Sequence, residues 1–330
     1  MTKPNSKNFC GGGFQNWLEV MLEPRCNGKC SFCIEKDGFR PEKRIPWKDL
    51  ADAILNTNKS PLQFLGGEPC LYPHLYDITK YLKEAGKNIY ITTNGSRFMD
   101  SSFSKSLRHV DGVNISIHHS DLLINKEITG INLKKNMLEL AVSDLHIWGA
   151  KVRFNCNCIN DYVDSKEACY KFIDFAKAMG ADGVRFAELK NDGRFVDLAK
   201  IFDHQYSLND EPFTLGCHQD AVINDMPVNF RQMCGMQTDK RPKIINPEQI
   251  LKQVMYYDGK IYNGWQKERN VSMKKNDKDS VKKILDQVKS GKLSVEEAQK
   301  LIQKLSDSLV KNAVNNTRSS YPDTGTGCAY

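Results

Sequence analysis

Three cysteines, Cys26, Cys30 and Cys33, stand on one short stretch of the chain in a C-x3-C-x2-C pattern. Three thiolates on one loop can bind three irons of a [4Fe–4S] cube and leave the fourth iron without a protein ligand, open to chemistry. The alternative is a zinc knuckle, but structural zinc is typically held by four ligands at paired C-x2–4-C spacings. The next cysteine along the chain is Cys70, so the spacing favours an open cluster over zinc.

A second motif, Gly66-Gly67-Glu68-Pro69, follows the short apolar run Leu62–Leu65. The two glycines expose backbone N–H and C=O groups, and Pro69 fixes the direction in which the chain leaves. Together with Glu68 they form a polar edge suited to gripping an ammonium group. The alternative is an ordinary turn.

Short apolar runs alternate with amphipathic helical stretches from about residue 17 to residue 190. Consecutive βα units of this kind predict a parallel sheet with right-handed crossovers. Functional groups of such sheets gather at the carboxyl ends of the strands, which is where the three-cysteine loop stands. The expected strands are Trp17–Leu22, Leu62–Leu65, Asn88–Thr92, Gly112–Ile117, Lys151–Ile159 and Gly183–Glu188, and the expected helices are Trp47–Leu55, Leu75–Ala85, Leu133–Val142 and Lys166–Met179.

Polar residues also end the later strands. Asn94 closes the third, and Ser116 and His118 close the fourth. His118 could act in acid–base chemistry or bind substrate, or simply lie at the surface with His119. Side chains alternate in the fifth strand, so its two faces carry different sets: Arg153, Asn155 and Asn157 on one, Phe154, Cys156 and Cys158 on the other.

The chain resembles the radical SAM superfamily over about residues 15–190. The three cysteines match the cluster motif of that family, including the aromatic Phe32 before the last cysteine. Gly66-Gly67-Glu68-Pro69 matches its second motif and continues as Leu71-Tyr72-Pro73, as in many members. Thr93-Asn94-Gly95 and Ser116 fall where members carry polar residues on the third and fourth strands.

The resemblance implies an α/β fold, a partial (β/α)6 barrel, that holds a [4Fe–4S] cluster and S-adenosylmethionine (SAM). SAM would chelate the open iron through its amino and carboxylate groups. An electron from a reducing partner such as flavodoxin or ferredoxin would then cleave SAM to methionine and a 5′-deoxyadenosyl radical, which abstracts a substrate hydrogen. The cofactor carries the chemistry, and the protein supplies positioning and exclusion.

The resemblance also assigns cofactor contacts by motif. Gly66, Gly67 and Glu68 would hold the amino group of SAM, in the turn that Pro69 completes. Phe32 would lie near the adenine. Polar residues at the strand ends complete the expected cofactor site: Asn94, and Ser116 and Asn155 for the ribose or carboxylate.

Arg153 or Arg185 could neutralise the SAM carboxylate, or either could be a structural ion-pair partner. Cys70 could return a hydrogen atom to a substrate radical, as in some peptide epimerases of the superfamily, or could be a buried inert thiol.

The alternation of strands and helices stops near residue 190. The expected organisation is a lead-in over 1–16, the core barrel over 17–190, a C-terminal α+β extension over 191–272, a helical hairpin over 273–313 and a flexible tail over 314–330. Strand-like pieces stand around Ala221–Phe230 and Leu251–Tyr262, and Ser294–Glu297 forms a capping box.

A second cluster could be built from Cys217 and Cys234 with Cys328 or His218. Where the molybdenum-cofactor cyclase branch has its middle ligand, this chain has Asp220, and carboxylate is a poor substitute for thiolate on iron–sulfur. An extension without a cluster is the favoured interpretation.

The composition, 40% hydrophobic and 26% charged, is that of a globular protein without a run of about 20 apolar residues that could span a membrane. No apolar signal core stands at the N-terminus, so we expect a cytoplasmic location and, for the eleven cysteines, reduced thiols. The net charge of +7 permits an acidic partner but does not require nucleic acid, and we expect no nucleic-acid or membrane partner.

The sequence thus predicts an oxygen-sensitive radical SAM enzyme that abstracts hydrogen from a peptide or another small-molecule substrate in natural-product biosynthesis. One alternative is a radical SAM enzyme for a nucleotide or cofactor precursor. An alternative of another class is a non-catalytic iron–sulfur or zinc protein.

Overall fold

The computed structural model describes residues 16–36, 38–189, 193–206, 208, 218–232, 253–263 and 265, and single positions between 284 and 301. The chain divides into two compact units, one formed by Met1–Lys267 with Gly325–Tyr330 and one formed by Glu268–Thr324. Everything that bears on the expected chemistry lies in the first unit.

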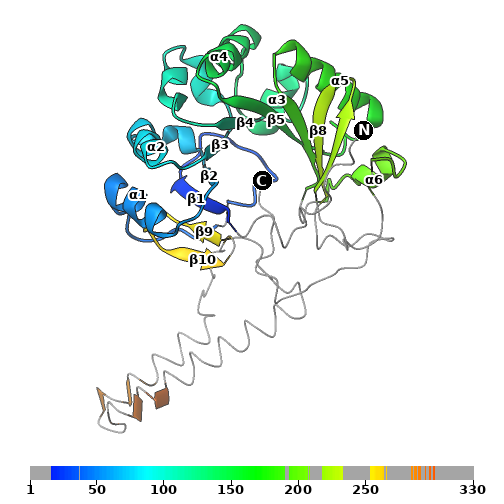
Figure 1. The fold of residues 1–330 in the computed structure, drawn as a ribbon. Coiled ribbons are helices and arrows are strands. Elements are labelled where there is room, and N and C mark those ends of the chain that lie inside the picture. The colour runs from blue at the N-terminus through cyan, green and yellow to red at the C-terminus, as the bar shows by residue number, and fades with distance from the viewer. Residues whose placement is uncertain are drawn as a thin grey trace. The chain divides into compact units, whose positions relative to one another are not determined.

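A parallel sheet forms the centre of the first unit. Its core strands follow one another in chain order: β1 (Leu18–Glu23), β2 (Leu62–Gly66), β3 (Ile89–Thr93), β4 (Gly112–Ser116), β5 (Lys151–Asn157) and β6 (Gly183–Ala187). The sheet is strongly curved, with helices along its outer side (Figure 1). The predicted α/β fold with a partial barrel is confirmed, and each strand begins and ends within two residues of its expected bounds.

The helices that cover the outer side are α1 (Trp47–Asn56), α2 (Leu75–Glu84), α4 (Lys135–Ile147) and α5 (Lys166–Ala178). Outward side chains of the strands, such as Phe64, Phe154 and Phe186, are completely buried beneath them. Burial of large apolar side chains on this face is what holds the sheet in its curved form.

Two short helices were not expected. The helix α3 (Leu122–Thr129) is capped by Asp121, whose side chain accepts a hydrogen bond from the backbone N–H of Leu123, and it ends at the left-handed Gly130. The helix α6 (Leu198–Ile201) has a similar cap at Asp197. Both are too short for a clear helical period, so only their caps mark them in the sequence. The helix expected over Leu133–Val142 extends further, to Ile147.

Two hairpins extend the barrel sheet at its two ends, giving the order β10-β9-β1-β2-β3-β4-β5-β6-β8-β7 among the described residues. The strand β8 (Met226–Arg231) runs parallel to β6 and pairs with antiparallel β7 (His218–Ile223). The strand β9 (Gln253–Met255) runs parallel to β1 and pairs with antiparallel β10 (Ile261–Asn263). Each strand-like piece expected in the extension is therefore a hairpin that continues the barrel.

The capping box expected in the second unit is present. The backbone N–H of Ser294 donates to the Glu297 carboxylate at 2.9 Å, and the N–H of Glu297 donates to the Ser294 hydroxyl at 3.2 Å. The remainder of the expected hairpin over 273–313 and the tail over 314–330 lie outside the described residues.

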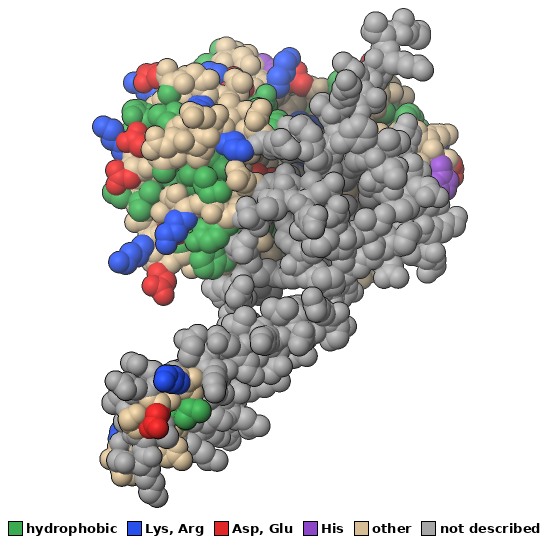
Figure 2. Space-filling view, turned by 60° about the horizontal axis from the view of Figure 1, so that its bottom comes forward, with side chains coloured by type: hydrophobic (Ala, Val, Ile, Leu, Met, Phe, Trp, Pro, Cys, Tyr) green, Lys and Arg blue, Asp and Glu red, His purple; other side chains and the backbone are tan. Residues whose placement is uncertain are grey.

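Two further properties concern the described part of the chain. Within the described part of the chain, no helix is long and apolar enough to cross a membrane. On the visible face of that part, basic and acidic side chains are interspersed and do not gather into one patch (Figure 2).

Candidate functional site

The concave inner face of the curved sheet encloses a space that we call the lumen. Its polar side chains lie opposite one another on neighbouring strands. Ser116 is opposite Asn155, Asn155 is opposite Arg185, and Arg185 is opposite Asn229. We refer to these four residues as the Asn155 row. The face assignment predicted for β5 is confirmed, because Phe154, Cys156 and Cys158 on the other face are fully buried in the core.

The three-cysteine loop leaves the carboxyl end of β1 and is fixed by backbone contacts. The N–H of Lys29 donates to the carbonyl of Thr129 at the end of α3, at 2.7 Å. Within the loop, the N–H of Gly28 donates to the Cys26 sulfur at 3.3 Å, and the N–H of Cys33 donates to the Cys30 carbonyl at 3.3 Å. Cys26 is exposed, whereas Cys30 and Cys33 are half-buried. These hydrogen bonds therefore hold the backbone that carries the three thiols in place.

The three thiols are close enough to influence one another. Burial, together with the charges of Cys33 and Cys26, raises the pKa of the Cys30 thiol to about 12. Burial also raises the pKa of Cys26. A bound cation lowers the pKa of a buried thiol, as iron does in a cluster.

The number of thiols on the loop bears on the kind of metal site that it could form. Among the described residues, no three His, Cys, Asp or Glu side chains converge so that they could hold one metal ion. A cube does not need such convergence, because each thiolate binds a different iron. Three thiols on one loop therefore fit a [4Fe–4S] cluster, in which the fourth iron needs no ligand from the loop.

The turn after β2 packs directly against this loop. The N–H groups of Gly67 and Glu68 donate to the carbonyls of Glu23 and Arg25, at 2.9 and 2.8 Å. A Cβ atom on Gly67 would lie 2.3 Å from the Arg25 carbonyl oxygen. At Gly66, φ is +130°, a conformation that L side chains rarely adopt. Both glycines are therefore required by the close approach of the two backbones.

Glu68 has a position that the sequence did not indicate. Its carboxylate is 1% exposed and accepts hydrogen bonds from the N–H of Cys70 (2.9 Å), the hydroxyl of Thr93 (2.6 Å) and the N–H of Asn94 (2.7 Å). Burial raises its pKa, and these hydrogen bonds act in the opposite direction. The carboxylate thus joins the ends of β2 and β3.

Asn94 reaches from the end of β3 to the cysteine loop. Its amide donates to the side chain of Asn27 at 2.9 Å and lies 3.8 Å from the Cys26 sulfur. Asn27 in turn donates to the hydroxyl of Ser96 at 2.9 Å. Asn27 and Ser96 were not among the expected site residues, although both stand beside expected ones in the sequence.

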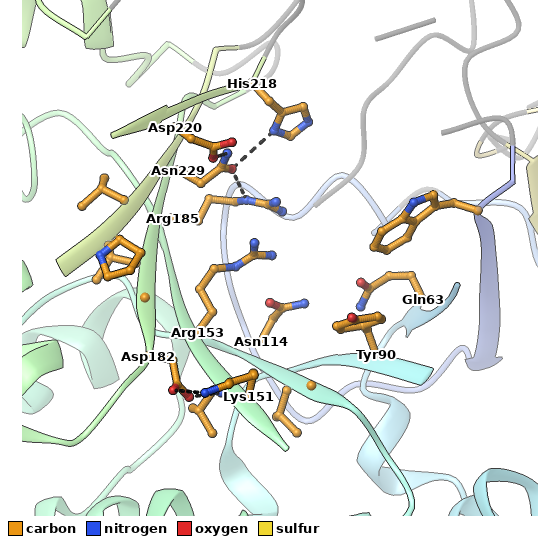
Figure 3. Close-up of a pocket in the computed structure, with 18 of the residues that line it drawn as sticks. Gln63, Tyr90, Asn114, Lys151, Arg153, Asp182, Arg185, His218, Asp220 and Asn229 are labelled. Carbon is orange, nitrogen blue, oxygen red and sulfur yellow. Dashed lines mark hydrogen bonds and ion pairs between the residues drawn. The ribbon is translucent and has the colours of Figure 1, made fainter. Parts of the chain in front are cut away.

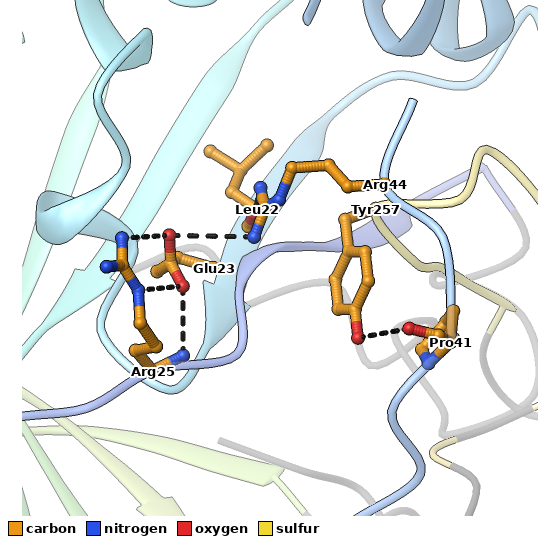
Figure 4. A network of polar contacts seen from close by, with 6 residues as sticks. All are labelled: Leu22, Glu23, Arg25, Pro41, Arg44 and Tyr257. Atoms are coloured by element: carbon orange, nitrogen blue, oxygen red, sulfur yellow. Dashed lines mark hydrogen bonds and ion pairs between the residues drawn. The ribbon is translucent and has the colours of Figure 1, made fainter. Parts of the chain in front are cut away.

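Glu23, the last residue of β1, holds the start of the loop (Figure 4). Its carboxylate accepts hydrogen bonds from the backbone N–H and the guanidinium of Arg25, at 2.9–3.0 Å, and lies 3.5 Å from the guanidinium of Arg44. Burial raises the pKa of Glu23, but the hydrogen bonds from Arg25 and the charge of Arg44 outweigh burial, and the net pKa is lowered. The residue before Cys26 is thereby fixed to the strand.

Phe32 and His118 lie in contact, with their rings edge to face and their centroids 5.1 Å apart. Nδ1 of His118 is 3.1 Å from the backbone N–H of Asn157 and accepts its hydrogen bond, so the ring proton of the neutral form is on Nε2. Burial lowers the pKa of His118 to about 4. His118 is therefore a neutral, buried ring behind the cysteine loop, not a surface histidine.

Several expected residues lie apart from the cysteine loop. Cys70 is buried in the hydrophobic core behind Glu68. Arg153 enters the lumen and donates from Nε to the Asn155 side chain at 3.2 Å. The proposed second-cluster ligands Cys217, Cys234 and Cys328 lie outside the described residues, and Asp220, on β7, accepts a hydrogen bond from Asn229 at 2.7 Å.

A cavity of about 900 Å³ occupies the lumen toward the amino ends of the strands. Figure 3 shows Arg153 and Arg185 directed into it from neighbouring strands, opposite Gln63 and Tyr90. The cavity reaches Arg185 and Asn229 of the Asn155 row. The cysteine loop stands at the opposite, carboxyl ends of the strands, so the two features occupy different halves of the lumen.

A curved parallel sheet with a three-thiolate loop after its first strand defines a class of barrel proteins that hold an iron–sulfur cluster. Residues 21–141 match the model of the radical SAM superfamily, so this part of the chain belongs to that superfamily. Membership implies a [4Fe–4S] cluster and SAM. Residues 279–308 match a second model, described as a SHOCT-like domain.

Sequence relatives include curated proteins described as "Probable GTP 3',8-cyclase". The one from Saccharolobus islandicus is 28% identical over 179 residues, which is 52% of this chain and 56% of the relative. The one from Sulfolobus acidocaldarius is 30% identical over 178 residues, 52% of this chain and 55% of the relative. The chain therefore spans little more than half the length of these relatives.

Among solved structures, the chain resembles SuiB of Streptococcus suis bound to the precursor peptide SuiA. The TM-score is 0.53 at 17% identity, and the match covers 77% of this chain and 60% of SuiB. At this identity the likeness shows a shared fold.

Proposed function

We propose that this protein is a radical SAM enzyme that abstracts a hydrogen atom from a peptide or other small natural-product-type substrate. The observation that carries the proposal is the contact of the cysteine loop with the Gly66–Pro69 turn and with Asn94. When bound, the cluster and SAM would supply a one-electron cleavage of the SAM sulfonium bond and a 5′-deoxyadenosyl radical.

In this proposal, Cys26, Cys30 and Cys33 bind three irons and leave the fourth for SAM. The Glu68 carboxylate is buried and already accepts three hydrogen bonds, so an ammonium group would meet the half-buried backbone of Gly66 and Gly67 instead. Glu68 then acts by keeping that backbone in place.

Phe32, Ser116 and Asn155 are the proposed contacts for the nucleoside part of SAM. His118 packs on Phe32 and keeps that ring in position. Each of these residues lies at the carboxyl end of a strand or in the cysteine loop. The buried aromatic wall would exclude water from the reacting atoms.

The cavity in the lumen, about 900 Å³, is large enough for a small-molecule substrate. Ligand cavities in proteins typically measure about 300–1,000 Å³. A peptide would enter with one or a few side chains. A nucleotide is the second candidate, and the specific observation in its favour is the sequence likeness to proteins described as GTP cyclases.

The experiment is anaerobic reconstitution of the full chain, followed by iron analysis and assay with SAM and a low-potential one-electron reductant. About four irons per chain and formation of 5′-deoxyadenosine are expected. Zinc in place of iron, with no SAM binding, would contradict the proposal. About eight irons per chain would instead support a second cluster.

A further inference from the structure

Arg231, the last residue of β8, is a buried cation with unsatisfied donor atoms among the described residues. It is 1% exposed, and among the described residues its Nε and Nη2 atoms have no hydrogen-bond partner. A buried guanidinium costs stability unless it is paired, and such unsatisfied groups in native proteins need an explanation. A ligand that accepts hydrogen bonds from these donors is one such explanation.

Arg153 lies close enough to Arg231 to respond to its charge. Burial lowers the pKa of Arg153 to about 10, the charge of Asp220 acts in the opposite direction, and the charge of Arg231 lowers this pKa further. Within the part of the chain that the structure describes, neither arginine forms an ion pair. Two positive charges thus repel each other inside the barrel.

The two arginines flank the Asn155 row, with Arg153 on its amino side and Arg231 on its carboxyl side. Arg153 lines the cavity and extends to Asn155, which its Nε contacts. Arg231 stands two residues beyond Asn229 on β8, opposite Ala187 at the end of β6. The cysteine loop follows β1 and contacts the ends of β3 and α3, so Arg231 belongs to a different part of the sheet.

We propose that Arg153 and Arg231 form a binding site for an oxyanion of the substrate, a carboxylate or a phosphate group. The site deepens the proposed function and rests on it, because an anchored substrate would present its adjoining atoms at the Asn155 row. Guanidinium forks match both kinds of oxyanion in geometry and charge. An oxyanion between the two arginines would remove their repulsion and satisfy the open donors of Arg231.

The test uses the anaerobically reconstituted full chain, with pyrophosphate and succinate as probes and without SAM or reductant. In the wild type, an oxyanion that binds the folded state raises the thermal midpoint. Arg231→Met keeps the bulk of the side chain and removes its charge. We expect this variant to bind the probe about 10- to 100-fold more weakly in calorimetry and to have a higher thermal midpoint than the wild type when no oxyanion is present.

The rise in the midpoint separates a ligand site from a structural arginine, whose loss would lower it. Arg108→Met is the matched control, since Arg108 is exposed and stacks on Tyr76; it is expected to bind like the wild type. Arg153→Lys keeps the charge but not the fork, and is expected to weaken binding less than Arg231→Met does.

Tighter binding of pyrophosphate assigns a phosphate source, and tighter binding of succinate assigns a carboxylate source. Binding of neither probe by the wild type, or a lower midpoint and unchanged binding in Arg231→Met, overturns the site. The measurement does not involve SAM cleavage. Failure of the wild type to form 5′-deoxyadenosine, with Arg231-dependent binding intact, therefore rejects the proposed function and not the oxyanion site.

Discussion

The backbone N–H of Asn94 donates a 2.7 Å hydrogen bond to the carboxylate of Glu68, and the Asn94 side chain contacts Cys26 and Asn27. Through this one carboxylate, the turn after β2 fixes the residue that touches the cysteine loop. Glu68 therefore contributes to the site as a buried support, although its motif suggests direct contact with a ligand.

Glu68→Gln is expected to lower the free energy of unfolding by about 2 kcal/mol, because an amide NH2 would replace an oxygen that now accepts from a buried donor. Urea denaturation under anaerobic conditions measures this change. Glu84→Gln, at the exposed end of α2, is the matched control and is expected to stay within about 0.5 kcal/mol of the wild type. Equal stability of the two variants would show that the three hydrogen bonds of Glu68 contribute little.

Gly67→Ala is expected to reduce the iron bound after reconstitution. The added Cβ would lie 2.3 Å from the Arg25 carbonyl oxygen and 2.6 Å from that of Pro24, so the start of the cysteine loop must move. Gly193→Ala is the control, because no atom lies within 4 Å of the Cβ added there. Iron content and thermal midpoint are measured together. An iron content like that of the control would contradict the close approach of the two backbones.

The stability of the protein is expected to fall as the pH drops from about 6.5 to about 4 because of His118. Its pKa in the folded state is about 4, against an ordinary value of 6.5, so the unfolded chain binds the proton more readily across this range. The corresponding loss is about 3 kcal/mol at the acid end. Above pH 6.5 this contribution is constant.

Unfolding free energies at pH 5 and pH 7 check the role of His118. The difference between the two values is expected to shrink in His118→Gln, whose amide oxygen can still accept from Asn157, and to persist in His119→Gln. An unchanged difference in His118→Gln would assign the acid sensitivity to other groups.

Cys26→Ala is expected to abolish binding of a complete cluster and formation of 5′-deoxyadenosine, since a cube that has lost one of three thiolates is poorly held. Cys169→Ala is the matched control. Cys169 is a buried thiol on α5 in the hydrophobic core, and its loss is expected to leave the iron content unchanged. Iron and sulfide analysis after anaerobic reconstitution measures the cluster content of both variants. Equal loss in both variants would point to a general folding defect.

The parallel core was predictable because its signals are local. The apolar runs from Leu62 and from Gly112 are short and bounded by turns, and the helices between them have a clear 3.6-residue period. The cysteine spacing and the two glycines are equally local, since a metal loop and a close backbone approach each need fixed neighbours in sequence.

The partners of buried polar groups were not predictable, because they come from distant segments. Nothing near Glu68 in the sequence shows that Thr93 and Asn94 will surround its carboxylate. Arg231 likewise stands next to an expected strand. Its burial with two unsatisfied nitrogen atoms depends on the pairing of β8 with β6. That pairing needed a parallel connection across a long gap in sequence, which periodicity does not encode.

The stacking of Phe230 on Phe186 joins the β7–β8 hairpin to the last core strand, with ring centroids 6.1 Å apart. The segment that matches the family model ends at residue 141, before β5 begins. A shortened protein that stopped after β6 would leave an unpaired parallel strand edge and a bare aromatic surface, both of which promote aggregation. The smallest fragment suitable for expression should therefore extend at least through β8.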